Sequence, residues 1–248
     1  MAHSQGDCGG AVTLVRDIPP TRNRLKAGHT LKELMNKSPH IIFDIETGGE
    51  PLETLVKLIP EFKAASNIKD PEKIEAAIRE KKNDFIESAA LSPLTGRVVA
   101  IGYIIDDKFD IIDCQEDEAA GLANFWKLVA MHYDTCTTDL IGFNSNGFDL
   151  PFLVRRSYKY GVPICRNIRH GRYWSGFCID LMDIWTLYNR EDRISLDNLS
   201  KFLGIGAKNG NGKDFARLWI EDRPKAIEYL ENDLRLTQKL ARKLGVIE

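Results

Sequence analysis

The stretch HIIFDIET, residues 40–47, sets two carboxylates inside a run of apolar, β-branched residues. Such a run is typical of a β-strand. Because side chains alternate across a strand, Asp44 and Glu46 project from one face, and Phe43 and Ile45 project from the other. Carboxylates in an apolar strand are costly unless they are solvated, hydrogen-bonded or bound to a cation. The stretch therefore predicts either an edge strand with a wet face or a strand that carries a functional acidic pair.

The chain downstream of this strand alternates between strand and helix patterns. The expected elements are strands at 97–106 and 108–115 joined by a tight turn, an amphipathic helix at 116–134, a strand at 138–144, a short strand near 177–182, a helix that Ser195 opens and Gly204 closes, a flexible loop at 208–213, and a helix from Pro224 to about Leu244. This order predicts one α/β domain, a mixed sheet flanked by helices.

Two segments fall outside this pattern. Residues 1–36 contain Gly9-Gly10 and Pro19-Pro20, and they predict an irregular N-terminal lead-in before a folded domain at 37–248. Residues 50–92 are rich in charges of both signs, and Asp70 followed by Pro71 predicts the start of a helix. We therefore expect a charged helical insertion after the first strand.

Composition limits the classes of protein that this chain can belong to. With 34 basic and 36 acidic residues, the net charge of −2 provides no global attraction to nucleic acid, so any polyanion site must come from local segregation of charge. No run of eighteen apolar residues occurs, which excludes a transmembrane helix, and the N-terminus lacks a secretory-signal pattern. The sequence predicts a soluble, cytoplasmic protein with no membrane partner.

Two further acidic positions follow along the chain. Asp149, in LIGFNSNGFDLPFL (140–153), fits either the N-cap of a helix or a ligand position at the carboxyl end of a strand. In EYLENDLRLTQKL (228–240), Tyr229 and Asp233 are four residues apart on a helix, along one flank of its apolar stripe. They are expected to be half-buried beside a cleft; the alternative is a tyrosine at the edge of the core and an exposed aspartate.

Together these segments resemble the three motifs of the DEDD superfamily of 3′–5′ exonucleases, which have an RNase H-like fold. Asp44-Ile45-Glu46 matches the first motif, and Asn144 through Asp149 resembles the second as found in proofreading domains of family B DNA polymerases. Tyr229 with Asp233 matches the tyrosine variant of the third motif, DEDDy, because Glu228 stands where the other variant requires a histidine. The resemblance spans roughly residues 40 to 244, apart from the insertion.

The resemblance implies a metal-dependent 3′–5′ exonuclease that hydrolyses phosphodiester bonds at the 3′ ends of single-stranded DNA. Two Mg²⁺ or Mn²⁺ ions supply the hydroxide and stabilise the anionic transition state in such enzymes, and both ions prefer carboxylate ligands. The implied residues are Asp44, Glu46, Asp149 and Asp233 as catalytic metal ligands, Tyr229 as the catalytic residue that orients the attacking water, and Asn144 and Phe148 as contacts to the terminal nucleotides.

Residues 151–179 carry the local charge that a nucleic-acid site requires. They contain six basic side chains, no acidic one, and interleaved aromatic residues. Such a stretch is typical of phosphate and base contacts, although Phe152 and other aromatics could instead pack in the core.

Three alternatives to a DNA exonuclease stay open. The same chemistry could act on RNA, since no residue of the motifs recognises a 2′-hydroxyl. The protein could also be a catalytically silent nucleic-acid-binding module, although the complete set of carboxylates and tyrosine argues against that. Finally, it could act only beside a replication or repair partner, such as a polymerase or helicase, that docks on residues 50–92.

Overall fold

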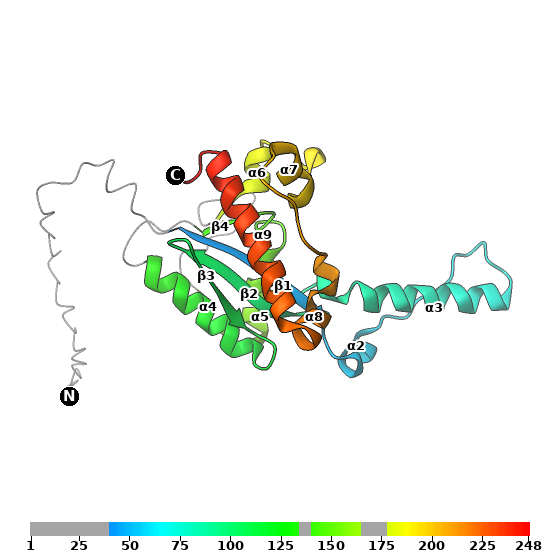
Figure 1. The fold of residues 1–248 in the computed structure, drawn as a ribbon. Helices are drawn as coiled ribbons and strands as arrows, with labels where there is room; N and C mark the ends of the chain where they lie inside the picture. The colour runs from blue at the N-terminus through cyan, green and yellow to red at the C-terminus, as the bar shows by residue number, and fades with distance from the viewer. Residues whose placement is uncertain (1–39, 134–139, 165–177) are drawn as a thin grey trace, which may run out of the picture. The chain divides into compact units, whose positions relative to one another are not determined.

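A computed structural model describes residues 40–133, 140–164 and 178–248, so the predicted lead-in at 1–36 lies outside the described residues. The strands are β1 (Ile41–Gly49), β2 (Gly96–Ile105), β3 (Lys108–Asp113), β4 (Leu140–Gly142) and β5 (Cys178–Asp180). They form one sheet in the order β3–β2–β1–β4–β5 (Figure 1). The pairs β1–β2 and β2–β3 are antiparallel, whereas β1–β4 and β4–β5 are parallel. The expected mixed sheet of an α/β domain is confirmed.

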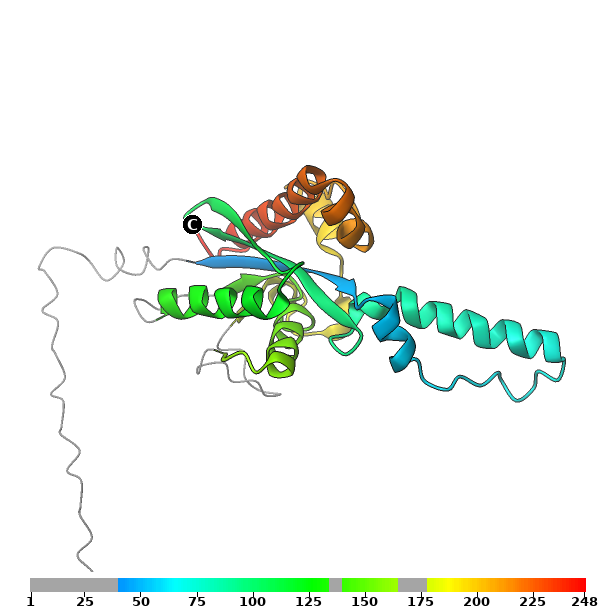
Figure 2. The ribbon, with the colours of Figure 1, turned by 90° about the horizontal axis from the view of Figure 1, so that it is seen from below.

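Helices cover both faces of this sheet. The described helices are α2 (Leu52–Leu58), α3 (Pro71–Glu87), α4 (Glu118–Tyr133), α5 (Asp149–Tyr160), α6 (Leu181–Trp185), α7 (Leu196–Leu203), α8 (Phe215–Glu221) and α9 (Arg223–Lys243), with single 3-10 turns η1 (Ala89–Leu91), η2 (Arg190–Asp192) and η3 (Gly212–Asp214). Helices α4 and α5 pack around Phe43 on one face, and α7, α8 and α9 pack around Ile42 on the other. Figure 2 shows β1 between the two layers. None of the helices in the described ranges is long and apolar enough to cross a membrane.

β1 lies in the middle of the sheet, with β2 on one side and β4 on the other. The edge-strand interpretation of HIIFDIET is therefore wrong. However, β4 pairs with β1 only at Ile41 and Ile42, because β4 ends at Gly142. Beyond Ile42, no strand among the described residues pairs with this edge of β1. This region lies at the carboxyl end of the parallel strands, which is where α/β sheets place ligands.

Local signals in the sequence correctly located several element boundaries. The β2–β3 turn holds Asp106 and Asp107 at φ 49° and 63°, the left-handed region that tight hairpins require. The Ser195 side chain accepts a hydrogen bond from the Asn198 amide at the start of α7, and Gly204 ends this helix at φ 67°. These caps satisfy backbone groups that a helix terminus otherwise leaves without partners.

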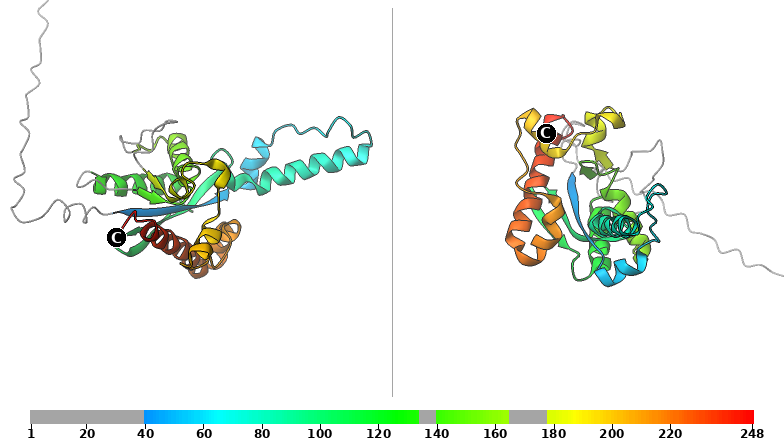
Figure 3. Two further views of the ribbon diagram at one scale, coloured as in Figure 1. Left: turned by 90° about the horizontal axis from the view of Figure 1, so that it is seen from above. Right: turned by 90° about the vertical axis from the view of Figure 1, so that its right-hand side faces the viewer.

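The segment 50–92 forms an arm that leads away from the sheet, as Figure 3 shows for α3. Asp70 caps α3 as predicted, with its Oδ1 accepting from the Glu72 amide at 3.0 Å. No residue of α3 is fully buried. The helix packs against η1 and against the preceding extended chain, where the rings of Phe62 and Phe85 lie 6.2 Å apart and Lys81 Nζ donates to the Lys63 carbonyl.

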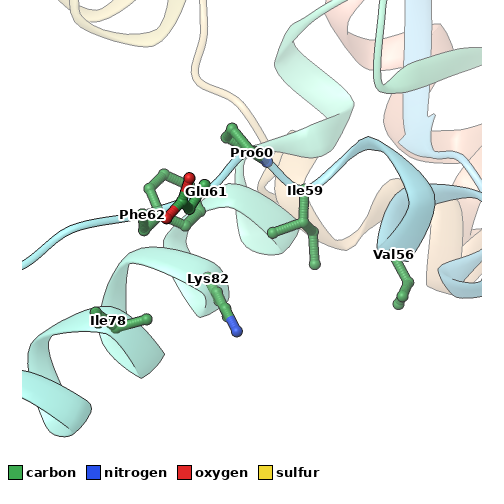
Figure 4. Close-up of a pocket in the computed structure, with 7 residues that line it drawn as sticks. All are labelled: Val56, Ile59, Pro60, Glu61, Phe62, Ile78 and Lys82. Atoms are coloured by element: carbon green, nitrogen blue, oxygen red, sulfur yellow. The ribbon is translucent and has the colours of Figure 1, made fainter.

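The base of this arm contains a shallow cavity of about 420 Å³ between α2, α3 and the chain that joins them (Figure 4). Its walls are largely apolar, with Glu61 and Lys82 as the charged lining residues. The cavity separates the arm's two helices and does not adjoin the cleft described below.

Candidate active site

A cleft of about 320 Å³ opens where β1 and β4 diverge. It is lined by all seven residues that the sequence analysis singled out, namely Asp44, Glu46, Asn144, Phe148, Asp149, Tyr229 and Asp233. They come from β1, the loop after β4, the start of α5, and the middle of α9. The fold therefore brings together three motifs that are far apart in the chain.

Three of the carboxylates form a compact cluster. One oxygen each of Asp44, Glu46 and Asp233 lies within 4.8 Å of the other two. Helix α9 can approach β1 this closely because Gly102, which pairs with Asp44 in the sheet, has no side chain. A Cβ at Gly102 would lie only 2.6 Å from Leu234 Cδ1 on α9. A glycine at this register position thus lets Asp233 reach the two carboxylates of the strand.

The two residues of the third motif are more deeply buried than expected. Asp233 is 2% exposed and Tyr229 is 5% exposed. The half-buried placement and the alternative of an exposed aspartate are both wrong, because α8 and the 208–213 loop cover the flank of the stripe on which these residues lie. The cleft therefore holds a desolvated carboxylate and a desolvated phenol.

Asp149 is the first residue of α5, and its carboxylate does not cap the helix. The N-cap position is Phe148, and Asp149 Oδ1 instead accepts a hydrogen bond from the Ile45 amide of β1 at 3.0 Å. That amide is available because β4 stops before reaching it. The N-cap interpretation is therefore wrong, and Asp149 ties α5 to the strand between Asp44 and Glu46.

Asp180, at the end of β5, holds the turn that carries the second motif. Its buried carboxylate accepts from the amides of Asn144 and Asn146, each at 2.8 Å, and from Met182 at 2.9 Å. Asn144 has φ 60°, so these bonds stabilise a left-handed backbone that Asn tolerates. Sequence reasoning missed Asp180; the available signal was an aspartate at a strand end directly before an apolar helix.

Lys208 is the other residue that sequence reasoning missed. Its Nζ lies 2.5 Å from Asp233 Oδ2 and 5.2 Å from the centre of the Tyr229 ring. The loop that was expected to be flexible is anchored by the Lys208 amide, which donates to Asp197 Oδ1, and it approaches Tyr229 so closely that a Cβ at Gly210 would lie 2.7 Å from the ring. The signal in the sequence was a lysine opening a glycine-rich loop before the third motif.

Comparison with known proteins assigns the chain to a family. Residues 88–238 match the model of a family described as a predicted 3′–5′ exonuclease related to the exonuclease domain of PolB. The chain belongs to this PolB-like exonuclease family. The match includes the second and third motifs and begins after β1, so Asp44 and Glu46 lie outside it. A protein of Methanocaldococcus jannaschii described as uncharacterized is 33% identical over 178 residues, which cover 66% of this chain and 96% of that protein.

Two DNA polymerases are similar to this chain over part of their length. The DNA polymerase of Archaeoglobus fulgidus is 27% identical over 159 residues, which are 59% of this chain and 20% of the polymerase. The structure of the family B DNA polymerase of Pyrobaculum calidifontis matches with a TM-score of 0.57 at 21% identity, over 84% of this chain and 24% of the polymerase. The matched part of the chain thus covers about a fifth to a quarter of the length of these two polymerases. The structural match shows a shared fold.

The cleft contains more acidic than basic side chains. Burial raises the pKa of Asp44 well above its ordinary value, and the three neighbouring carboxylates raise it further. Burial, followed by the charge of Asp233, raises the pKa of Glu46, and burial raises the pKa of Asp149 to about 6 and also that of Asp233. Burial disfavours the Lys208 ammonium, but the charge and hydrogen bond of Asp233 together with the charges of Asp44 and Glu46 outweigh burial and raise the pKa of Lys208. One ammonium therefore stands among four acids.

This arrangement fits a divalent cation. Within the described part of the chain, Asp233 Oδ1 is buried without a hydrogen-bond partner. The ammonium of Lys208 lies against the other oxygen of the same carboxylate, where it acts as a cation among hard oxygen donors. Carboxylate oxygens are the ligands that Mg²⁺ and Mn²⁺ prefer. The donor set of Asp44, Glu46 and Asp233 has the composition and spacing of such a site.

Tyr229 lies beside this cluster as a neutral phenol. Burial raises its pKa, and the charges of Glu46 and Asp233 raise it further. The hydroxyl therefore keeps its proton at neutral pH and can donate a hydrogen bond, whereas a general base would need a pKa near the working pH.

The basic stretch at 151–179 is only partly available to a ligand. Phe152 lies in the core, and Arg156 is buried between Glu50 and Glu118. The alternative in which Phe152 packs in the core is therefore confirmed, and Arg156 is not available to nucleic acid, because its guanidinium pairs with Glu50 and Glu118. Arg155 is exposed, and residues 165–177 lie outside the described residues.

Proposed function

We propose that this protein is a metal-dependent 3′–5′ exonuclease of the DEDDy type that removes nucleotides from the 3′ end of single-stranded DNA. The observation that carries the proposal is the convergence of Asp44, Glu46 and Asp233 within 4.8 Å of one another, in a cleft that also contains Asp149 and Tyr229. Membership of the PolB-like exonuclease family supports the direction of cleavage.

The four carboxylates are the proposed metal ligands. Asp44 clusters with Glu46 and Asp233, and the charges of these two residues and of Asp149 all raise its pKa. Two bound Mg²⁺ or Mn²⁺ ions would supply an activated hydroxide and stabilise the charge on the transferred phosphate and the leaving oxygen. The protein's own contribution is to hold the ligands on a central strand and a buried helix, so that the reacting phosphodiester meets preorganised charge.

Tyr229 is proposed to orient the attacking water. Its raised pKa keeps the hydroxyl protonated, and the packing of its ring against the Gly210 loop limits its motion. Lys208 reaches the same point from that loop. If metal ions bound the carboxylates, they would replace the Lys208 ammonium beside Asp233, and the ammonium could then contact a phosphate of the substrate.

Asn144 and Phe148 are proposed to hold the terminal nucleotides. Both line the cleft, and Phe148 stands immediately before Asp149 with its ring 5.5 Å from that of Phe152. An aromatic face at this position can stack an unpaired base, whereas a paired end would have to fray first. The cleft therefore favours a single strand over a duplex.

The test is cleavage of end-labelled oligonucleotides by the purified full chain. With 5′-labelled single-stranded DNA, Mg²⁺ or Mn²⁺ is expected to give a ladder of stepwise shortening, and EDTA is expected to stop it. Cutting of a circular single strand, or undiminished cleavage in EDTA, would refute the proposal. Asp44→Asn is the matched control, because it removes a ligand charge at nearly constant volume.

The same assay separates the alternatives. Faster shortening of RNA than of DNA of the same sequence would identify an RNA exonuclease. Tight binding without cleavage under either metal would identify a silent binding module. Cleavage that appears only when a polymerase or helicase is added would identify a subunit that works through a partner.

A further inference from the structure

An exposed apolar surface lies beside the cleft on the edge formed by α6, η2 and α7. Leu187 is 85% exposed, Phe202 is 73% exposed, and Tyr188 is 68% exposed. The half-buried ring of Trp185 packs edge-on against that of Phe202, with 5.9 Å between their centres. We call the three rings, together with the apolar side chain of Leu187, the aromatic platform. Such a cluster of large apolar side chains in water indicates a binding surface.

Two of these residues are held outward by a backbone that they do not prefer. Leu187 and Tyr188 have φ 50° and 64°, a left-handed conformation that is rare for bulky side chains. The Tyr188 amide donates to the Asp183 carbonyl at 2.9 Å, which closes the turn. Backbone strain of this kind persists at ligand-binding sites, where the conformation that presents the side chain is itself useful.

The platform is continuous with the proposed active site. Helices α6 and α7 both contribute to the lining of the cleft, through Met182 and Leu196. Asp183, whose carbonyl holds Tyr188, also accepts a hydrogen bond from Asn146 Nδ2 at 3.0 Å. The turn that carries the second motif is therefore linked to the platform through one residue.

The guanidinium of Arg193 lies close to the second-motif turn. The exposed side chain of Arg193 extends over the second-motif turn, where a Cβ at Gly147 would be 3.1 Å from Arg193 Nη2. Among the described residues, no carboxylate pairs with Arg193, and the neighbouring Asp192 is bonded instead to Asn189 at 2.7 Å. An exposed arginine without an acidic partner, at the mouth of a cleft, is suited to a phosphate.

We propose that Arg193 and the aromatic platform bind the single strand that trails from the cleft, on the 5′ side of the nucleotides being removed. This inference rests on the proposed function, which places the 3′ end beside Asn144 and Phe148. Exposed rings stack bases of any identity, and a guanidinium contacts the phosphate between them, which is how proteins bind unpaired strands without reading sequence. The platform would explain how a cleft of this size retains a long strand between successive cuts.

The test compares two matched double variants for binding to fluorescein-labelled oligo(dT) of 4 and 20 nucleotides by anisotropy in EDTA. Tyr188→Asn/Arg193→Gln removes a platform ring and the guanidinium, and Asn tolerates the left-handed backbone. Ile220→Asn/Arg217→Gln is the control. Ile220 is 71% exposed and Arg217 is 59% exposed, and both lie on α8, which contributes no residue to the lining of the cleft.

Wild type and the control are expected to bind the 20-mer far more tightly than the 4-mer. The platform variant is expected to bind the 20-mer at least about tenfold more weakly, so that the preference for length falls toward one. In Mg²⁺, its KM for the 20-mer should rise more than its kcat falls. Phe202→Ser, which replaces an exposed ring in a different element, repeats the test independently.

Equal binding of the 20-mer by wild type, the platform variant and Phe202→Ser would overturn the inference, whether or not the wild type cuts DNA. A wild type without any preference for length would also overturn it, and the platform would then be a surface for a protein. Binding that depends on the platform, in a protein that never cuts, would leave the inference standing and refute the proposed function.

Discussion

Two groups of buried charges in this protein have opposite balances. Arg156, on α5, is 1% exposed and pairs with Glu118 and Glu50, while Lys159 pairs with the same Glu50. Two acids thus meet two bases. Burial opposes both charged forms, but the pairing lowers the pKa of Glu50 and raises that of Arg156.

The cleft presents the reverse case. Asp44, Glu46, Asp149 and Asp233 face a single ammonium from Lys208, and the pKa values of all four carboxyls are raised. A buried charge group that serves only stability is expected to be compensated, because each unpaired ion costs several kcal/mol. The uncompensated carboxylates of the cleft therefore lower the stability of the fold, which is the pattern expected of a site that binds positive charge. The compensated group around Arg156 stabilises the fold.

The largest expected effect is that of Asp44→Asn on activity. Loss of the central ligand charge should lower kcat by at least about 10³-fold, as when a group acting in the transition state is removed. The same change should raise the Tm of the metal-free protein at pH 8, because one repelling charge disappears. Single-turnover cleavage and differential scanning fluorimetry measure the two effects, and a fall in the metal-free Tm would contradict the proposed imbalance.

Arg156→Met should have the largest effect on stability. It leaves Glu118 buried without its charged partner and Glu50 with Lys159 alone, and breaking a buried pair in this way typically costs about 3–5 kcal/mol. Urea denaturation measures the free energy of unfolding. The control is Arg217→Met, because Arg217 forms ion pairs at the surface and is 59% exposed, so the change should cost less than about 1 kcal/mol. Similar costs for both variants would show that the buried group is not structural.

Tyr229→Phe should reduce catalysis while keeping the packing of the ring. If the hydroxyl orients the attacking water, kcat should fall by about 10²-fold with little change in KM. Asp233→Ala should be more severe, since it deletes a proposed ligand. Single-turnover rates at saturating Mg²⁺ measure both effects. Unchanged cleavage by Tyr229→Phe would show that Tyr229 only packs in the core.

The pH dependence of stability should distinguish the two charge groups. The pKa of Asp149 is about 6 in the fold, above its ordinary value, so its protonated form stabilises the protein below pH 4 and that contribution is lost as the pH rises through 6. The Tm of Asp149→Asn minus that of metal-free wild type should therefore grow by several degrees between pH 4 and 7. Glu50, whose pKa is lowered, should give the opposite trend in Glu50→Gln. Thermal melts across this range measure both.

Lys208→Met should have the smallest effect. Without the ammonium, the carboxylates repel one another more strongly, so the metal-free Tm at pH 7.5 should fall by a few degrees. Divalent metal then meets no competing cation, and the Mg²⁺ concentration that gives half of the stabilisation should decrease about two- to threefold. Fluorimetry in a Mg²⁺ titration tests this, with Lys201→Met, which removes an exposed ion pair, as the control.

Periodicity and capping residues were sufficient to predict most elements. The apolar, β-branched run in HIIFDIET, the Asp70-Pro71 helix start and the Ser195 and Gly204 caps depend on neighbours within a few residues, and the strand and the helix ends that they predict were confirmed. Local signals could not show that β1 is central or that Arg156 is buried, because both depend on which segments pack together.

The sequence by itself paired Asp44 with Glu46 and Tyr229 with Asp233, because each pair shares a face through the period of a strand or a helix. The resemblance to the exonuclease motifs added Asp149 and implied that these residues meet in one site. Only the tertiary structure decided what surrounds them. A three-residue β4 frees the Ile45 amide for Asp149, Gly102 admits α9 to the sheet, and a loop from elsewhere brings Lys208 to Asp233. Burial and repulsion act through space rather than along the chain, and they raise the pKa values of these four acids.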